Sequence, residues 1–260
     1  MAHNNPVIFQ VINHAVLLWY GNSREQHNRS GRVKKRILSA GRLIGLSGII
    51  CLSLITMAKG MTETYRPGLV TAAEKGDLIT VKQLIKQGGD IEQRDNRLRT
   101  PLMAAVHGNR TDVARYLIEQ GADVNAADAI MDTPYLYAGA CGLQDILEMT
   151  LSHGADLKST NRYGGTALIP ASERGHVKTV KTLIDAGVNV NHINNLGWTA
   201  LIEAIILGDG SQKYADIVTL LIEGGADVNL PDASGDSPLT LAKRHGYRNL
   251  AAILERAAAQ

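Results

Sequence analysis

Short apolar groups recur between residues 66 and 257 at the three- and four-residue spacing of an amphipathic helix. They are Val81/Leu84/Ile85, Val113/Leu117/Ile118, Ile146/Met149, Val180/Leu183/Ile184 and Ile217/Leu220/Leu221. A segment rich in small residues precedes each group, and a Gly-containing turn follows it. The pattern predicts pairs of short helices, of which the second is amphipathic.

Two motifs repeat in step with these groups. A Thr-Pro-Leu-like triplet begins at Thr100, Thr133, Thr166, Thr199 and Ser237, at spacings of 33, 33, 33 and 38 residues. A Gly-Ala-Asp-Val-Asn-like segment begins at Gly121, Gly154, Gly187 and Gly225, with a degenerate earlier copy at Gly88. The Thr or Ser hydroxyl is suited to cap the first helix, and Pro fits the first helical position because its missing N–H costs nothing there.

Small residues occupy one position of every predicted first helix: Ala72, Ala105, Ala138, Ala171, Ala204 and Ala242. Small side chains allow adjacent helices to approach closely. A left-handed residue is expected to end each first helix, at Gly76, Asn109, Gly142, Gly175, Gly208 and Gly246. Because each unit leaves apolar faces that only its neighbours cover, stability is expected to accumulate along a stack.

These motifs, held in register over six units, resemble those of the ankyrin-repeat family. The resemblance covers residues 66–257 and implies an all-α ankyrin-repeat solenoid of about six helix-turn-helix units with short hairpin or turn tips. The units are expected at 66–95, 96–128, 129–161, 162–194, 195–232 and 233–257. The His that often follows Thr-Pro-Leu in that family is absent here, so its interlocking polar link is lost.

Two departures from the repeat predict local changes. Pro170 lies about one turn into its helix and would cost about 3 kcal/mol if its lost hydrogen bond is not compensated. The fifth unit has 38 residues instead of 33, and the excess falls in the Gly-rich, polar segment 208–214. We expect that segment to project as a mobile loop.

Composition and charge narrow the class of protein. The 260 residues are 45% apolar and 4% aromatic, which argues against disorder and favours packing by small aliphatic side chains. Residues 1–58 carry seven Lys/Arg and one acid, whereas residues 59–260 carry twenty Lys/Arg and twenty-four acids. A mildly acidic body argues against a nucleic-acid partner, because phosphate neutralisation needs clustered basic residues.

The N-terminal segment is typical of an export signal. Residues 43–58 (LIGLSGIICLSLITMA) contain no charge and follow the basic run 32–36. This order predicts a signal peptide at residues 33–58 and a periplasmic protein. The alternative is a membrane anchor at residues 43–58, although that run is shorter than the roughly 20 residues of a spanning helix. We interpret residues 1–32 as a mis-annotated or disordered extension, with translation starting at Val33.

The repeats offer no recognisable catalytic or cofactor site. No Gly-x-x-x-x-Gly-Lys-Ser/Thr, Gly-x-Gly-x-x-Gly, His-Glu-x-x-His or Gly-x-Ser-x-Gly motif occurs. The histidines are spread over different units, and Cys141 is interpreted as a small residue at a helix end rather than a reactive thiol. We therefore expect no enzymatic activity, no cofactor and no metal.

The family resemblance places a protein-binding surface on the hairpin tips and the first-helix faces. The offset from each Thr assigns ten residues to it: Arg94, Arg97, Arg99, His107, Met131, Tyr163, Arg174, Leu196, Trp198 and Arg244. A basic tip gives way to an apolar and aromatic centre, and Trp, Tyr and Arg are favoured at interface hot spots. The alternatives are solvation for the arginines, and packing against neighbouring hairpins for Leu196 and Trp198.

The predicted function is that of an exported, monomeric, non-enzymatic module that binds an unidentified protein. The alternative is a secreted effector that binds a host protein. Contact with a membrane is expected only through the N-terminal segment, if that segment is retained.

Overall fold

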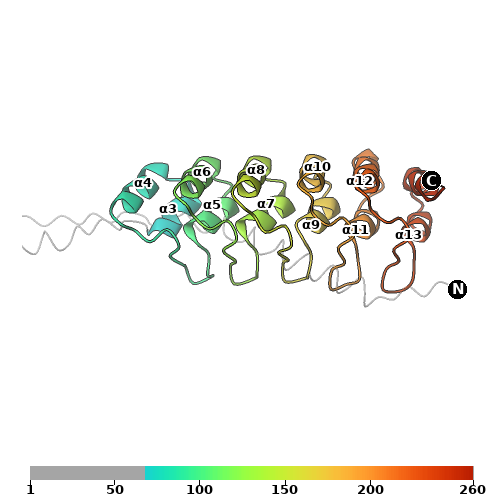
Figure 1. Cartoon of the computed structure of the whole chain (residues 1–260), viewed down its shortest axis with the longest axis horizontal. Helices are drawn as coiled ribbons and strands as arrows, with labels where there is room; N and C mark the ends of the chain where they lie inside the picture. Colours follow the sequence, from blue (N-terminus) through green and yellow to red (C-terminus); the bar gives the residue numbers. More distant parts are fainter. Residues whose placement is uncertain (1–67, 260) are drawn as a thin grey trace, which may run out of the picture. The chain divides into compact units, whose positions relative to one another are not determined.

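The computed structural model describes residues 68–259, which form a row of paired helices (Figure 1). The helices are α3 (Leu69–Lys75), α4 (Leu78–Lys86), α5 (Pro101–His107), α6 (Thr111–Glu119), α7 (Pro134–Cys141), α8 (Gln144–Ser152), α9 (Leu168–Glu173), α10 (Val177–Asp185), α11 (Ala200–Ile206), α12 (Gln212–Glu223), α13 (Pro238–Arg244) and α14 (Arg248–Ala258). The odd-numbered helices form one layer and the even-numbered helices the other, and each helix packs on its pair partner and on the next helix of its layer. The predicted all-α solenoid of six helix pairs is confirmed.

The interpretations of residues 1–32 and 33–58 lie outside the described residues. The signal peptide, the membrane anchor and the start at Val33 therefore stay predictions. Within residues 68–259, no helix has both the length and the apolar character needed to cross a bilayer.

The alanines of the first helices explain how closely the units stack. All six predicted alanines are completely buried. The left-handed ends are also present at Gly76, Asn109, Gly142, Gly175 and Gly246, with φ between 51° and 80°. The expectation for Gly208 is wrong, because the longer connection of the fifth unit moves the left-handed residue to Gly210, with φ of 69°.

The predicted caps form at four of the five Thr or Ser positions. The hydroxyl oxygens of Thr100, Thr133, Thr199 and Ser237 each accept the backbone N–H three residues ahead, at 3.1, 3.1, 3.2 and 3.2 Å respectively. Proline occupies the first helical position after three of them. These caps fix where the first helices of units two, three, five and six begin.

Thr166 is the exception, and Pro170 is the reason. Pro170 has no N–H to donate to the Thr166 carbonyl, and the N–H of Ile169 donates to that carbonyl instead, at 3.3 Å. The Thr166 hydroxyl is left buried without a hydrogen-bond partner, so the predicted cap is wrong. The helix α9 begins only at Leu168, which makes Pro170 its third residue, where an N–H has no intrahelical acceptor. The equivalent residues of the other units, Ala104, Tyr137, Glu203 and Leu241, all donate their N–H to the carbonyl of the capping Thr or Ser, so one hydrogen bond is lost at Pro170 as predicted.

Three of the five extra residues of the fifth unit lengthen a helix, and the other two lie in the connection before it. The helix α12 has 12 residues, whereas α4, α6, α8 and α10 have 9 each. Tyr214 in its first turn is 5% exposed, and its hydroxyl donates to the Glu173 carbonyl at 2.7 Å. Because Tyr214 fastens the segment to the fourth unit, the expected projecting loop is wrong.

Amide side chains link neighbouring units beyond the ends of the second helices. Asn125 accepts the Asp156 N–H at 2.8 Å and donates to the Gly154 carbonyl at 3.0 Å. Asn191 makes the same two bonds to the fifth unit, also at 2.8 and 3.0 Å. Lys158 occupies the equivalent position at the junction of the third and fourth units. Its ammonium group cannot accept a hydrogen bond, so it cannot make the same pair of bonds.

Candidate binding surface

The hairpins of units two to six end in five-residue turns that are all built in the same way. We call these turns the tips; they comprise residues 95–99, 128–132, 161–165, 194–198 and 232–236. The first residue of each is Asp or Asn, and one of its side-chain oxygens accepts the N–H of the third and fifth residues at 2.8–3.1 Å. The N–H of the first residue also donates to the carbonyl of the fifth. The third and fourth residues therefore form the apex of each tip.

The fourth residue of every tip is left-handed. Glycine fills this position in the last three tips, but Leu98 and Met131 fill it in the first two, with φ of 57° and 66°. A large side chain is rare in this conformation, and such strain is more common at functional sites than elsewhere. Met131 was predicted to face a partner. Leu98 was missed, although its 33-residue register with Met131 could have identified it.

Exposed apolar side chains gather at the tips. Among residues 68–259, the large hydrophobic side chains that are exposed are Ile79, Leu98, Ile130, Met131, Tyr163, Ile193 and Leu196. Five of these seven lie at tip apices, and Ile193 directly precedes the fifth-unit tip. We call Leu98, Ile130, Met131, Tyr163 and Leu196 the apolar tip row. Figure 1 shows the hairpins projecting side by side from the same side of the helices.

The three predicted arginines of the first tip have different surroundings. The Arg99 side chain is 4% exposed and bonded to both Glu74 and Asp95, at 2.8 Å each, so it stabilises the tip and offers no free surface. Arg94 is exposed, but its guanidinium donates to the carbonyls of Leu98 and Ala127 at 2.9 and 2.6 Å. Arg97 is exposed and only 3.6 Å from a Glu74 oxygen. The first tip therefore presents Arg97 and part of Arg94, rather than three free cations.

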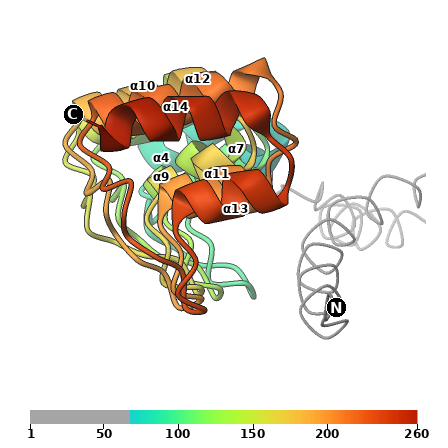
Figure 2. The same ribbon diagram turned by 90° about the vertical axis from the view of Figure 1, so that its right-hand side faces the viewer.

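The space between the first helices and the hairpins forms the second part of the surface, which we call the inner corner. Figure 2 looks along the row and shows the hairpins turning away from the first helices on one side. His107, at the end of α5, stacks on Tyr137 of α7 with ring centroids 4.1 Å apart, and its Nε2 lies 3.6 Å from an Asp128 oxygen. Burial and the neighbouring Asp128 raise the pKa of Asp132 to about 6.

Carboxylates surround Arg174 farther along the inner corner. The Arg174 guanidinium donates to the Ala140 carbonyl at 2.7 Å and lies 3.8 Å from the Cys141 sulfur. Glu203 is 6% exposed and accepts a hydrogen bond from the Asn194 amide at 2.7 Å. Burial and the nearby Glu173 raise the pKa of Glu203 to about 8, so this carboxyl is mainly protonated at neutral pH.

The position of Cys141 agrees with a structural role. Burial raises the pKa of its thiol, and the nearby Arg174 only partly offsets that effect. The thiolate, which is the reactive form of cysteine, is therefore disfavoured.

Two further predicted residues border the inner corner. Trp198 is half-buried, packs against the core and ends its tip at the register position that Arg99 and Asp132 occupy in theirs. Arg244 is exposed, and its two terminal nitrogens bond both oxygens of Asp236 at 2.7 and 2.8 Å. The partner-binding roles of the ten residues stay predictions.

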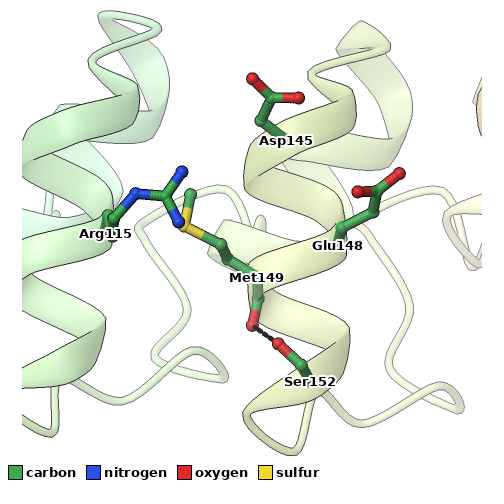
Figure 3. Close-up of a pocket in the computed structure, with 5 residues that line it drawn as sticks. All are labelled: Arg115, Asp145, Glu148, Met149 and Ser152. Atoms are coloured by element: carbon green, nitrogen blue, oxygen red, sulfur yellow. Dashed lines mark hydrogen bonds between the residues drawn. The ribbon is translucent and has the colours of Figure 1, made fainter.

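A pocket of about 240 Å³ lies between α6 and α8 (Figure 3). Arg115 lines it from α6, and Asp145, Glu148, Met149 and Ser152 line it from α8. Because α6 and α8 are the second helices of their units, the pocket lies away from the tips. Within residues 68–259, no three His, Cys, Asp or Glu side chains are grouped so as to hold a metal ion.

Comparison with known proteins agrees with this architecture. A sequence profile described as ankyrin repeats (3 copies) matches residues 50–128, 68–161 and 135–232. The putative ankyrin repeat protein YahD of Escherichia coli (strain K12) is 46% identical over 57 residues, which is 22% of this chain and 28% of that relative. The match therefore spans little more than a quarter of the length of YahD.

Two crystal structures resemble the fold over most of their own length. One is an ankyrin repeat domain from Acinetobacter baumannii AYE, with 58% identity and a TM-score of 0.72, covering 73% of this chain and 97% of that one. The other is the ankyrin repeat protein EF0377, with 43% identity and a TM-score of 0.70, covering 73% and 96%. Ankyrin repeats are protein-interaction modules and generally non-enzymatic. The chain belongs to the ankyrin-repeat family.

Proposed function

We propose that this chain is an exported binding protein that holds a protein partner against its inner corner and catalyses no reaction. One observation carries the proposal. The partly exposed residues His107, Tyr137, Arg174 and Trp198 line this corner, one from each of four consecutive units. Aromatic and arginine side chains supply most of the binding energy at protein interfaces, which makes this corner the favoured contact surface.

The electrostatics of the inner corner support a binding role. Glu173, Glu203 and Asp132 all lie within electrostatic reach of Arg174, and burial raises the pKa of each carboxyl. Burying a carboxyl group lowers stability unless it is well paired. The same position holds Ala104 in the second unit and Leu241 in the sixth, so the fold itself does not require an acid there. Glu203 is 6% exposed and so offers no contact surface itself, but with Glu173 it sets the charge around the partly exposed Arg174.

A preformed corner would bind with little loss of conformational entropy. The caps and tip turns fix the backbone on both sides of the corner before a partner arrives. Rigid surfaces lose less entropy on association than loops that must become ordered.

Affinity capture tests the binding surface. The wild-type chain and the His107→Ala/Trp198→Ala variant are used to capture proteins from a periplasmic extract, with Asp145→Asn on the opposite side as the matched control. Loss of two anchor residues is expected to lower recovery of a specific partner about tenfold or more, with unchanged helical circular dichroism. Equal recovery by all three proteins would refute the inner corner as the contact surface.

Cell fractionation with N-terminal sequencing tests export. Cleavage after Ala58 predicts a periplasmic protein that begins at Lys59. Recovery from the culture medium would favour the secreted effector, and a membrane-bound protein that retains residues 43–58 would favour the anchor. A cytoplasmic protein that retains those residues would refute export.

A further inference from the structure

None of the exposed residues of the tips that carry the apolar tip row is an acid, and Glu74 of α3 lies 3.6 Å from Arg97 beside the first of them. The exposed residues at the five tips include Arg97, Arg162 and neutral residues. The tip acids are buried or half-buried, and three of them, Asp95, Asp128 and Asp232, direct an oxygen to the N–H groups of their own turn. The tips therefore present apolar and cationic groups on a body in which acids outnumber Lys and Arg.

Neighbouring tips also end at a similar depth, and some are linked to each other. Figure 1 shows the hairpins ending at similar depth, and Figure 2 shows the ends of the later hairpins close together, with the first, teal-green hairpin to one side of them. The Ala129 N–H donates to the Arg97 carbonyl and the Asn195 N–H to the Tyr163 carbonyl, at 2.9 Å each, which links adjacent tips. A flat surface can therefore touch several apices at once without a matching shape of its own.

We propose that the apolar tip row docks on an anionic lipid surface. Leu98, Ile130, Met131, Tyr163 and Leu196 enter the boundary between headgroups and acyl chains, and Arg97 and Arg162 lie against lipid phosphates. Apolar side chains combined with Arg are the chemistry of an interfacial binder, and each cation adds attraction to an anionic leaflet. The guanidinium of Arg162 lies 4.7 Å from the Tyr163 ring centroid, so these two side chains approach the surface together.

A lipid surface fits these observations better than an acidic protein. A protein partner would need its own row of apolar sites at the spacing of the tips, whereas a bilayer accepts apolar side chains at any spacing. The proposal goes beyond the protein partner of the inner corner, which uses other side chains. With the tips on a bilayer, a protein held in the corner would lie beside the membrane.

Amide hydrogen exchange on the full chain gives a site-resolved test. The chain is mixed with vesicles of phosphatidylcholine alone, or of phosphatidylcholine with phosphatidylglycerol. Slower exchange at residues 96–98, 129–131 and 162–163, only with the anionic vesicles, is the expected result. Unchanged exchange at these tips would overturn the proposal, even if the N-terminal segment carried the whole chain to the vesicles. Unchanged exchange together with protection by an acidic protein would assign the row to that protein.

Variants separate docking from folding. Leu98→Gly/Met131→Gly places glycine where the other three tips already have it, so the turns are retained while two row side chains are lost. We expect partition onto the anionic vesicles to fall about tenfold or more, with no loss of resistance to urea. Arg97→Gln/Arg162→Gln is expected to have a similar effect at low salt. The control is Ile79→Ser, which removes an exposed apolar side chain outside the row. Wild-type partition by both double variants would overturn the proposal.

Discussion

Replacing Glu203 by Gln should change the pH dependence of stability in a way that isolates this one carboxyl. Glu203 is almost completely enclosed between the fourth and fifth units. Glu173 at the end of α9 and Arg174 directly after that helix lie near it, and the Asn194 amide donates to it from the tip. A Gln side chain has nearly the same shape and can still accept the Asn194 bond, but it carries no ionisable proton.

The sign and size of the effect follow from the raised pKa. The pKa rises from 4.5 to about 8, chiefly because burial penalises the charged form. Between these values the folded chain keeps the proton and the unfolded chain releases it, so stability falls as pH rises. The total loss is about 5 kcal/mol, at about 1.4 kcal/mol for each pKa unit. Below pH 4.5 this carboxyl does not change the free energy of unfolding, and above pH 8 it lowers that free energy by the full amount.

Urea unfolding followed by circular dichroism from pH 5 to pH 9 measures the effect. Glu203→Gln is expected to be about 3 kcal/mol more stable than wild type at pH 7 and about 5 kcal/mol more stable at pH 9, with a much smaller difference near pH 5. Titrating groups that do not interact with Glu203 contribute equally to both proteins and cancel in the difference. Stability curves that stay parallel across this range would refute the reasoning, because a group that ionises freely in the folded state gives no such divergence.

Three further substitutions test the packing, all by urea unfolding. Gly139→Ala should cost about 1–3 kcal/mol, because the new Cβ would lie 2.8 Å from the Ala167 Cβ; a gain, as normal helix propensity predicts, would show that α7 and α9 separate easily. Tyr214→Phe should cost about 1 kcal/mol through loss of the bond to Glu173, and no change would restore the loop interpretation. Thr100→Ala should cost about 1 kcal/mol, whereas Thr166→Ala should cost nothing because its hydroxyl bonds to nothing; equal losses would contradict the account of Pro170.

Most of the fold could be predicted because its determinants are local and repeated. A hydroxyl at each helix start, an alanine in each first helix and a left-handed residue at its end are read from neighbouring positions. Each feature also recurs after 33 residues, so one degenerate unit does not hide the pattern. The departures were harder to predict. In the fourth unit the Thr166 carbonyl accepts the Ile169 N–H because Pro170 has none, and the repeat pattern does not show where that helix begins.

The surface was harder to predict because its residues depend on distant partners. Arg99 was placed on the correct tip, but its burial results from Glu74, which lies 25 residues away in the sequence. Tyr214 is anchored by a carbonyl 41 residues earlier, which no local pattern indicates. The environment of Glu203 likewise arises only when α9 and α11 pack together. Spacing assigned residues to the tips and first helices, but it could not tell exposed from internally paired side chains.

The lysine at position 158 makes the links between successive units unequal. Asn125 and Asn191 each fasten two successive units through a pair of bonds, whereas Lys158 lacks the acceptor needed to do the same. The third and fourth units are tied through their helices instead, where Gln144 bonds Thr182 and Arg174 donates to the Ala140 carbonyl. A force along the array would therefore be carried at that junction by the helices and not by an amide beyond them.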